Sequence, residues 1–175
     1  TRAETYLSHI GREIAAIAAL FDRDREVIQL HFGGGTPNFL SPTQLRCTVE
    51  VLKRHFRFSD ADNRDISIEL DPRTVSPQDM AELALAGFNR ASLGVQDFDP
   101  AVQAAVNRIQ GVEQTRAVVD ACRNHGFRSI NLDLIYGLPN QTVAGFARTL
   151  ETVIAMRPDR LAVYSYAHLP DMFKA

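Results

Sequence analysis

Residues 66–96 have the sequence ISIELDPRTVSPQDMAELALAGFNRASLGVQ, which is the most informative part of the chain about its fold. Its first five residues, 66–70, alternate between apolar and polar side chains, which is typical of a strand. Ser76 then precedes a proline, a common start of a helix, and Gly87 is a common helix end. A second strand-like run follows at 91–95. The stretch therefore predicts a strand, a helix and a second strand in succession.

The same succession extends over the whole chain. Strands are expected at 27–32, 66–70, 91–95, 129–134 and 160–166. Helices are expected at 3–20, from Pro42, from Pro77, from Pro100, from Val112 and at 142–156. Five strands that alternate with helices predict an α/β fold with a parallel sheet, either curved toward a barrel or open. In both architectures, ligands bind at the carboxyl ends of the strands, where polar residues and glycines gather in this sequence.

The composition favours one globular domain. The chain has 175 residues, of which 45% are hydrophobic and 23% are charged, and its net charge is -2. This balance is typical of a soluble protein and gives no basic surface that would indicate a nucleic acid or an anionic membrane as partner. Apolar runs are too short for a membrane span, and the first residues lack a signal-peptide pattern. We expect a cytoplasmic protein.

Cysteine and histidine residues do not indicate a metal site. The chain has two cysteines, Cys47 and Cys122, both within helical patterns and far apart. We expect both to be buried, reduced thiols of the core, because free cysteine is often buried. His31, His125 and His168 show no spacing of metal ligands, and His125 precedes a glycine at an expected helix end.

Three glycines follow the first strand in the sequence GGGTP, residues 33–37. Glycines leave the backbone uncovered, so a small zwitterion could approach the main chain closely. A tight turn without a ligand is an equally good interpretation. A phosphate site in a barrel aldolase or isomerase is a third, but it needs a basic or Schiff-base residue at a strand end. Lys53 and Lys174 are the only lysines, and neither is placed there.

Four polar residues, of which Glu69, Gln96 and Asp133 lie at strand ends, are candidates for ligand contacts. Alternation places Glu69 and Ser67 on one face of their strand, where a carboxylate can bind an ammonium or a hydroxyl group. Gln96 and Asp133 suit ribose hydroxyls, and Arg108 suits a carboxylate. For each of them, an ion-paired, capping or solvated surface role is an open alternative.

Six segments, taken in order, identify a family resemblance. They are HFGGGTPNFL (31–40), ISIELDPRT (66–74), FNRASLGVQDFD (88–99), VNRIQ (106–110), INLDLIYGLPNQT (130–142) and RLAVYSYAHLP (160–170). Together they resemble the oxygen-independent coproporphyrinogen III dehydrogenases of haem biosynthesis, which are radical S-adenosylmethionine enzymes. GGGTP and GVQ are shared more widely among radical enzymes of this kind, including the haem chaperones. ELDPR, GVQDF and YAHLP point to the dehydrogenases.

The resemblance implies a partial (β/α)6-type barrel with a curved parallel sheet, formed by residues 1–175 as a single incomplete domain. The family's first strand and its CxxxCxxC loop, which binds a [4Fe-4S] cluster, are missing and would precede Thr1. S-adenosylmethionine would lie across the strand ends. The family binds two such molecules, and the resemblance does not divide the expected contacts between them. These contacts are Gly34, Gly35 and Thr36 for the methionine amino end, Glu69, Gln96, Arg108 and Asp133 for other polar groups, and Ala167 for the adenosine pocket.

The implied reaction is the oxidative decarboxylation of coproporphyrinogen III. A reduced electron donor and the cluster would cleave S-adenosylmethionine, and a substrate propionate would lose hydrogen, carbon dioxide and an electron to become a vinyl group. The product is protoporphyrinogen IX. The named residues would bind the cofactor, and none would act as an acid or a base. The chain alone is expected to be inactive. A haem chaperone with the same barrel and an inert barrel fragment are the alternatives.

Overall fold

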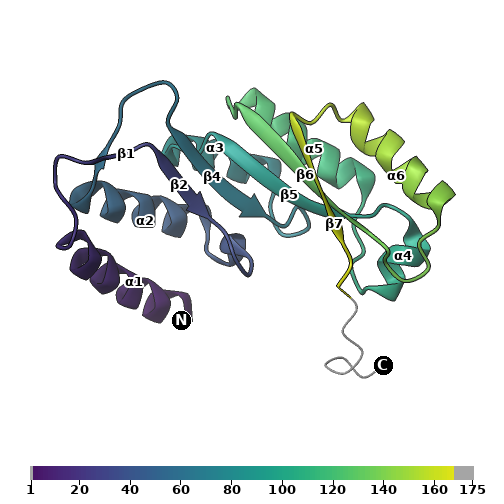
Figure 1. The fold of residues 1–175 in the computed structure, drawn as a ribbon, viewed down its shortest axis with the longest axis horizontal. Coiled ribbons are helices and arrows are strands. Elements are labelled where there is room, and N and C mark those ends of the chain that lie inside the picture. The colour runs from purple at the N-terminus through teal and green to yellow at the C-terminus, as the bar shows by residue number, and fades with distance from the viewer. Residues whose placement is uncertain (1, 168–175) are drawn as a thin grey trace.

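The structure, a computed structural model, describes residues 2–167 (Figure 1). Helices and strands alternate along them. In order, the elements are α1 (Arg2–Ala18), β1 (Glu26–Val27), β2 (Gln29–Phe32), the 3-10 helix η1 (Pro37–Phe39), α2 (Pro42–His55), β3 (Arg57–Phe58), β4 (Asp65–Leu70), α3 (Pro77–Ala86), β5 (Arg90–Gln96), α4 (Pro100–Ala105), α5 (Val112–Asn124), β6 (Ser129–Tyr136), α6 (Val143–Ala155) and β7 (Arg160–Ser165).

A parallel sheet of five strands forms the centre of the fold. Its order is β2-β4-β5-β6-β7. Apart from β3, which lies outside this sheet, each strand of the sheet pairs with the strand that follows it along the chain. Helices connect the strands, and α3 packs between α2 and α5 along one side of the sheet (Figure 1). The predicted α/β fold with a parallel sheet is confirmed.

Local sequence signals set the ends of the helices. Ser41 and Ser76 each accept a hydrogen bond from the third residue of the following helix, and that residue's side chain binds the serine amide in return. Such reciprocal capping satisfies backbone amides that have no partner within the helix. At the end of α3, Gly87 adopts a φ of 104°, a left-handed conformation that favours glycine. These signals explain why the strand–helix–strand pattern could be predicted from the sequence.

The two faces of the sheet differ in polarity. In β4, Ile66, Ile68 and Leu70 are buried, whereas the residues between them are half-buried. The same alternation holds in β5 and β6. The buried side chains pack against residues of the covering helices, including Met80 and Val119. The predicted placement of Glu69 and Ser67 on the opposite, polar face agrees with this pattern.

Three details differ from the sequence predictions. The expected strand 27–32 is interrupted, because Glu26–Val27 pairs with β3 and only Gln29–Phe32 joins the main sheet. The short strand β3 itself was not predicted. Cys47 is exposed on α2, so the prediction that it is buried was wrong, whereas Cys122 is buried as predicted. The helical period places Cys47 on the solvent side of α2, between the buried Leu45 and Val49.

Two further findings concern the carboxyl end of the chain and the helices. His168 and the last residues of the YAHLP motif lie outside the described range. Within residues 2–167, no helix combines the length and the hydropathy that a bilayer-spanning helix requires.

Candidate functional site

A polar cavity of about 160 Å³ lies at the carboxyl ends of β2, β4, β5 and β6. It shares Thr36 and Pro37 with a larger, mostly apolar cavity of about 590 Å³, and it shares Glu69, Ser92 and Asp133 with one of about 290 Å³ on the polar face of the sheet. The lining residues of the polar cavity are Gly35, Thr36, Pro37, Glu69, Leu70, Asp71, Ser92, Gly94, Gln96, Arg108 and Asp133.

Two structural features explain why glycines form the turn after β2. A Cβ atom on Gly33 would lie 2.4 Å from His31 Nε2 and 2.8 Å from Glu69 Oε1, so both side chains would have to move to admit one. Gly34 and Gly35 have open space around them but adopt φ angles of 73° and 51°. Residues with a Cβ disfavour such angles, so the conformation favours glycine at 34 and 35, whereas Gly33 leaves room for the side chains of His31 and Glu69.

Glu69 is bound to this turn although it belongs to β4. Its Oε2 accepts a hydrogen bond from the Gly34 backbone amide at 3.1 Å. Its Oε1 lies 3.2 Å from His31 Nε2, and His31 Nδ1 lies 2.8 Å from the Ser67 hydroxyl. The carboxylate is thereby fixed at the edge of the cavity, with one face turned toward the glycine backbone.

Asp133 provides a second carboxylate on the polar face. Ser92 donates a hydrogen bond to its Oδ2 at 2.8 Å, and the Asn131 amide donates to its Oδ1 at 2.6 Å. Burial raises the pKa of Asp133, the nearby charge of Glu69 acts in the same direction, and the two hydrogen bonds offset only part of this rise. A cationic ligand group would relieve the unfavourable burial of this carboxylate.

Gln96 ends β5 in an unusual conformation. Its φ is 65°, and the pairing of β5 with β6 shifts register between Gly94 and Gln96. Such an angle costs conformational energy in a residue other than glycine, and the angle persists only where the surroundings enforce it. The bulge turns the last part of β5 so that Gln96 lines the cavity.

The residue after Gln96 holds this bulge in place. Asp97 is 2% exposed, and its carboxylate accepts hydrogen bonds from Thr149 Oγ1 and Gln141 Nε2, each at 2.5 Å. The Gln103 side chain donates to the Asp97 carbonyl at 2.9 Å. Asp97 therefore ties the end of β5 to α4, to α6 and to the loop after β6.

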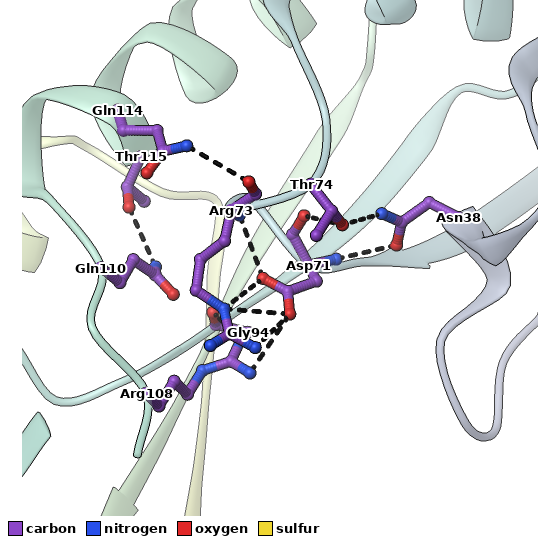
Figure 2. A network of polar contacts seen from close by, with 9 residues as sticks. All are labelled: Asn38, Asp71, Arg73, Thr74, Gly94, Arg108, Gln110, Gln114 and Thr115. Carbon is purple, nitrogen blue, oxygen red and sulfur yellow. Dashed lines mark hydrogen bonds and ion pairs between the residues drawn. The ribbon is translucent and has the colours of Figure 1, made fainter. Parts of the chain in front are cut away.

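Arg108 and Asp71 both line the cavity and contact each other (Figure 2). Arg108 donates a hydrogen bond to the Gly94 carbonyl at 2.9 Å and contacts Asp71 Oδ2 at 3.4 Å. Burial acts to raise the pKa of Asp71, but hydrogen bonds from Arg73 and the charge of Arg108 outweigh it and leave the pKa below its ordinary value. Burial lowers the pKa of Arg108, although a guanidinium remains charged in proteins.

The charges around the cavity favour a zwitterion that carries an additional positive charge. Three carboxylates, those of Glu69, Asp71 and Asp133, line it, and Arg108 is the one basic side chain among its lining residues. Such a cavity attracts cationic groups at Glu69 and Asp133 and can bind a carboxylate at Arg108. These lining residues include no histidine, cysteine or lysine, and the Ser92 hydroxyl is engaged in holding Asp133, so the arrangement is suited to binding and orientation.

The structure brings most of the predicted site residues together. Six of the eight line the polar cavity, namely Gly35, Thr36, Glu69, Gln96, Arg108 and Asp133. Gly34 lines the neighbouring apolar cavity and donates its amide to Glu69. Ala167 lies exposed just beyond β7 and is not among the residues that line either cavity.

Several contributing residues were not singled out by the sequence. Ser92 and Asn131 hold Asp133, Asp71 holds Arg108, and His31 contacts Glu69. Period-two alternation could have placed Ser92 and Asn131 on the polar face. The Asp71–Arg108 contact joins residues 37 positions apart, and no local signal predicts it.

The described residues do not fit an iron–sulfur cluster. Cys47 is exposed and Cys122 is buried, and burial raises the pKa of Cys122 to about 12, which opposes the thiolate that a cluster needs. Within residues 2–167, no group of three or more histidine, cysteine or acidic side chains is arranged to hold a metal ion.

Comparison with known proteins shows one family. The sequence model of the Radical SAM superfamily matches residues 5–153. The chain is 54% identical over 172 residues to the oxygen-independent coproporphyrinogen III oxidase of Pseudomonas aeruginosa, with 98% of this chain and 37% of the relative covered. The corresponding Escherichia coli protein is 47% identical over 174 residues, which cover 99% of this chain and 37% of that protein.

Comparison with solved structures agrees with this family assignment. The structure of the E. coli coproporphyrinogen III oxidase, described as a radical SAM enzyme, matches with a TM-score of 0.93 at 46% identity and covers 98% of this chain and 39% of its own. A radical S-adenosylmethionine methyltransferase from Kitasatospora setae matches with a TM-score of 0.70 at 18% identity, covering 93% of this chain and 31% of its own, and shares the fold. The chain thus spans well under half the length of these relatives.

Proposed function

Since the chain belongs to the radical S-adenosylmethionine superfamily, we propose that it forms the cofactor-binding part of an oxygen-independent coproporphyrinogen III dehydrogenase. The reaction converts propionate side chains of coproporphyrinogen III into vinyl groups with loss of carbon dioxide and gives protoporphyrinogen IX in haem biosynthesis. The 54% identity to a coproporphyrinogen III oxidase over nearly the whole chain supports this choice within the superfamily.

The observation that carries the proposal is the charge pattern of the polar cavity. S-adenosylmethionine has an ammonium, a sulfonium and a carboxylate, so its net charge is positive. Glu69 and Asp133 would hold the cationic groups, and Arg108 would hold the carboxylate. The glycine turn would admit the methionine end close to the backbone of Gly34 and Gly35, because no Cβ atom covers it.

The remaining predicted contacts would serve the same molecule or the second S-adenosylmethionine that the family resemblance implies. Thr36 would receive the methionine amino end together with the glycine turn, Gln96 would bind a ribose hydroxyl through its amide, and Ala167 would line the adenosine pocket. When bound, S-adenosylmethionine supplies the adenosyl group that removes hydrogen from the substrate propionate. The protein's own residues would bind the cofactor, fix its orientation and keep water away from it.

In this proposal, neither the cluster ligands nor the electron donor are supplied by the residues of this chain. Because Cys47 and Cys122 do not suit a cluster, the [4Fe-4S] ligands would come from outside the chain. A reduced electron donor and coproporphyrinogen III would be the partners of the full-length protein. The chain alone would be inactive, and cleavage of S-adenosylmethionine by the purified chain without additions would contradict that.

Anaerobic turnover of the full-length protein tests the function. The protein would be reconstituted with iron and sulfide and incubated with coproporphyrinogen III, S-adenosylmethionine and a chemical reductant. We expect vinyl products that separate by chromatography and appear only when S-adenosylmethionine is present. Tight binding of haem with no vinyl product would instead favour a haem chaperone.

A further inference from the structure

One carboxylate, that of Asp71, contacts two arginine side chains just beyond the end of β4 (Figure 2). Arg73 binds it with two nitrogens, Nη2 at 2.7 Å from Oδ2 and Nε at 3.0 Å from Oδ1. Arg108 approaches the same Oδ2 with Nη1 at 3.4 Å. The Asp71 side chain is 12% exposed, so water screens these contacts only weakly.

Arg108 is held at a second point. Its Nη2 donates to the Gly94 carbonyl at 2.9 Å, so the guanidinium bridges from the end of β4 to β5. A Cβ atom on Gly94 would lie 3.0 Å from the same Nη2, which shows how closely the arginine lies against the strand. Two contacts fix the plane of a guanidinium, and an arginine fixed in this way loses less conformational freedom when a ligand binds.

Asp71 is also joined to the glycine-turn side of the cavity. Its backbone amide donates to Asn38 Oδ1 at 3.0 Å, and Asn38 Nδ2 donates to Thr74 Oγ1 at 2.5 Å. Asn38 lies in η1, directly after the GGGTP sequence. The contacts of Asp71 therefore connect Asn38, in the segment that follows the glycine turn, with Arg108 (Figure 2).

We infer that Asp71 is a positioning residue. It orients the Arg108 guanidinium so that this group can bind the carboxylate of S-adenosylmethionine. This inference rests on the proposed function. Asp71 acts through Arg108 and not by its own contact with the ligand, because a second carboxylate repels the group that Arg108 binds. Arg73 contributes by pairing with Asp71, so that this carboxylate does not fully offset the positive charge of Arg108 and the guanidinium can still attract the ligand.

A double-mutant cycle in the full-length, cluster-reconstituted protein tests this role. The equilibrium dissociation constant for S-adenosylmethionine would be measured for the wild type, Asp71→Asn, Arg108→Ala and the double variant. We expect Asp71→Asn to weaken binding about tenfold. If Asp71 acts through Arg108, the double variant binds no more weakly than Arg108→Ala alone.

Asp65→Asn is the matched control. Asp65 begins the same strand and also contacts two arginines, Arg90 at 2.9 Å and Arg128 at 3.6 Å, but it lies at the opposite end of β4 from the cavity. This variant should lose stability to a similar degree, measured by thermal unfolding, and keep wild-type affinity. Equal loss of affinity in both aspartate variants would overturn the inference, because the effect would then be one of general stability.

The remaining outcomes separate the two proposals. If the wild type binds and Arg108→Ala weakens binding while Asp71→Asn does not, the positioning role is wrong and the proposed function stands. The positioning role is also wrong if adding Asp71→Asn to Arg108→Ala weakens binding by a further factor of about ten, since the two effects are then independent. If the reconstituted wild type does not bind S-adenosylmethionine, the proposed function fails and this inference fails with it.

Discussion

The Glu69 carboxylate on β4 accepts a hydrogen bond from the Gly34 backbone amide at 3.1 Å, across 35 positions of the sequence. This contact joins the glycine turn to the neighbouring strand and fixes a negative charge beside uncovered backbone. The contact depends on the absence of a side chain at Gly33, because a Cβ atom there would lie 2.8 Å from Glu69 Oε1.

Gly33→Ala should therefore weaken binding of S-adenosylmethionine to the full-length protein by about tenfold or more, because Glu69 and His31 must both move away from the added methyl group. Equilibrium dialysis with labelled ligand measures this. Gly11→Ala, in α1, has nothing within 4 Å of the added Cβ atom and is the matched control, for which we expect unchanged affinity. Unchanged affinity in Gly33→Ala would contradict this account of the turn.

Gln96→Gly should separate stability from binding. Glycine relieves the positive φ of 65°, which favours the folded state by about 1 kcal/mol, but it removes the amide that lines the cavity. We expect a protein of equal or higher thermal stability with weaker binding of S-adenosylmethionine. Arg157→Gly, at a φ of 54° and outside the cavity, is the control that should gain stability and keep its affinity. Full affinity in Gln96→Gly would show that its amide does not bind the ligand.

The affinity for S-adenosylmethionine should fall as the pH decreases through the raised pKa of Asp133. Burial is the main cause of that raised pKa, and the charge of Glu69 adds to it. Protonation removes a negative charge that favours the cationic ligand, so binding is strongest above this pKa. Asp133→Asn should bind weakly at all pH values and lose this part of the pH dependence. A pH profile identical to that of the wild type would contradict this role.

The same raised pKa has a consequence for the protein without ligand. An aspartate whose pKa is higher in the folded than in the unfolded state contributes stability that is full below the unfolded pKa and is lost as the pH rises through the folded pKa. Asp133→Asn should therefore raise the unfolding temperature at neutral pH and have less effect in mild acid. A lower unfolding temperature at neutral pH would show that the hydrogen bonds from Ser92 and Asn131 dominate.

The two cysteines should react differently with iodoacetamide at mildly alkaline pH. Cys47 is exposed and should be alkylated in the folded protein, whereas Cys122 is buried, with a pKa of about 12, and should react only after unfolding. Mass spectrometry of peptides identifies the modified residue. Because neither thiol is proposed to bind iron, Cys47→Ser should leave the iron content of the reconstituted protein unchanged. A loss of iron in that variant would contradict the assignment.

The sequence predicted the fold well because its signals are local. Capping at Ser41 and Ser76, the left-handed end at Gly87 and the alternation in β4 each depend on neighbouring residues alone. The interruption near Ile28 could not be predicted in this way, because it arises from pairing with β3, far along the chain. Cys47 was misplaced because residue type outweighed the helical period in that prediction.

The candidate site was predicted only in part, because some of its contacts join residues that are far apart in the sequence. Strand ends, the glycine pattern and the family resemblance together named six residues that line the cavity, but contacts between distant segments decided which neighbours hold them. Asp71 contacts Arg108 from another loop, and Asp97 holds the bulge at Gln96 through α6 and the loop after β6. Such contacts depend on the tertiary arrangement.

A structure of the full-length protein with S-adenosylmethionine would show whether the polar cavity at the strand ends binds this ligand. We predict electron density for the methionine part beside Gly34 and Gly35, with its carboxylate at Arg108 and its cationic groups toward Glu69 and Asp133. Density for the ligand elsewhere, with these side chains uncontacted, would contradict the account.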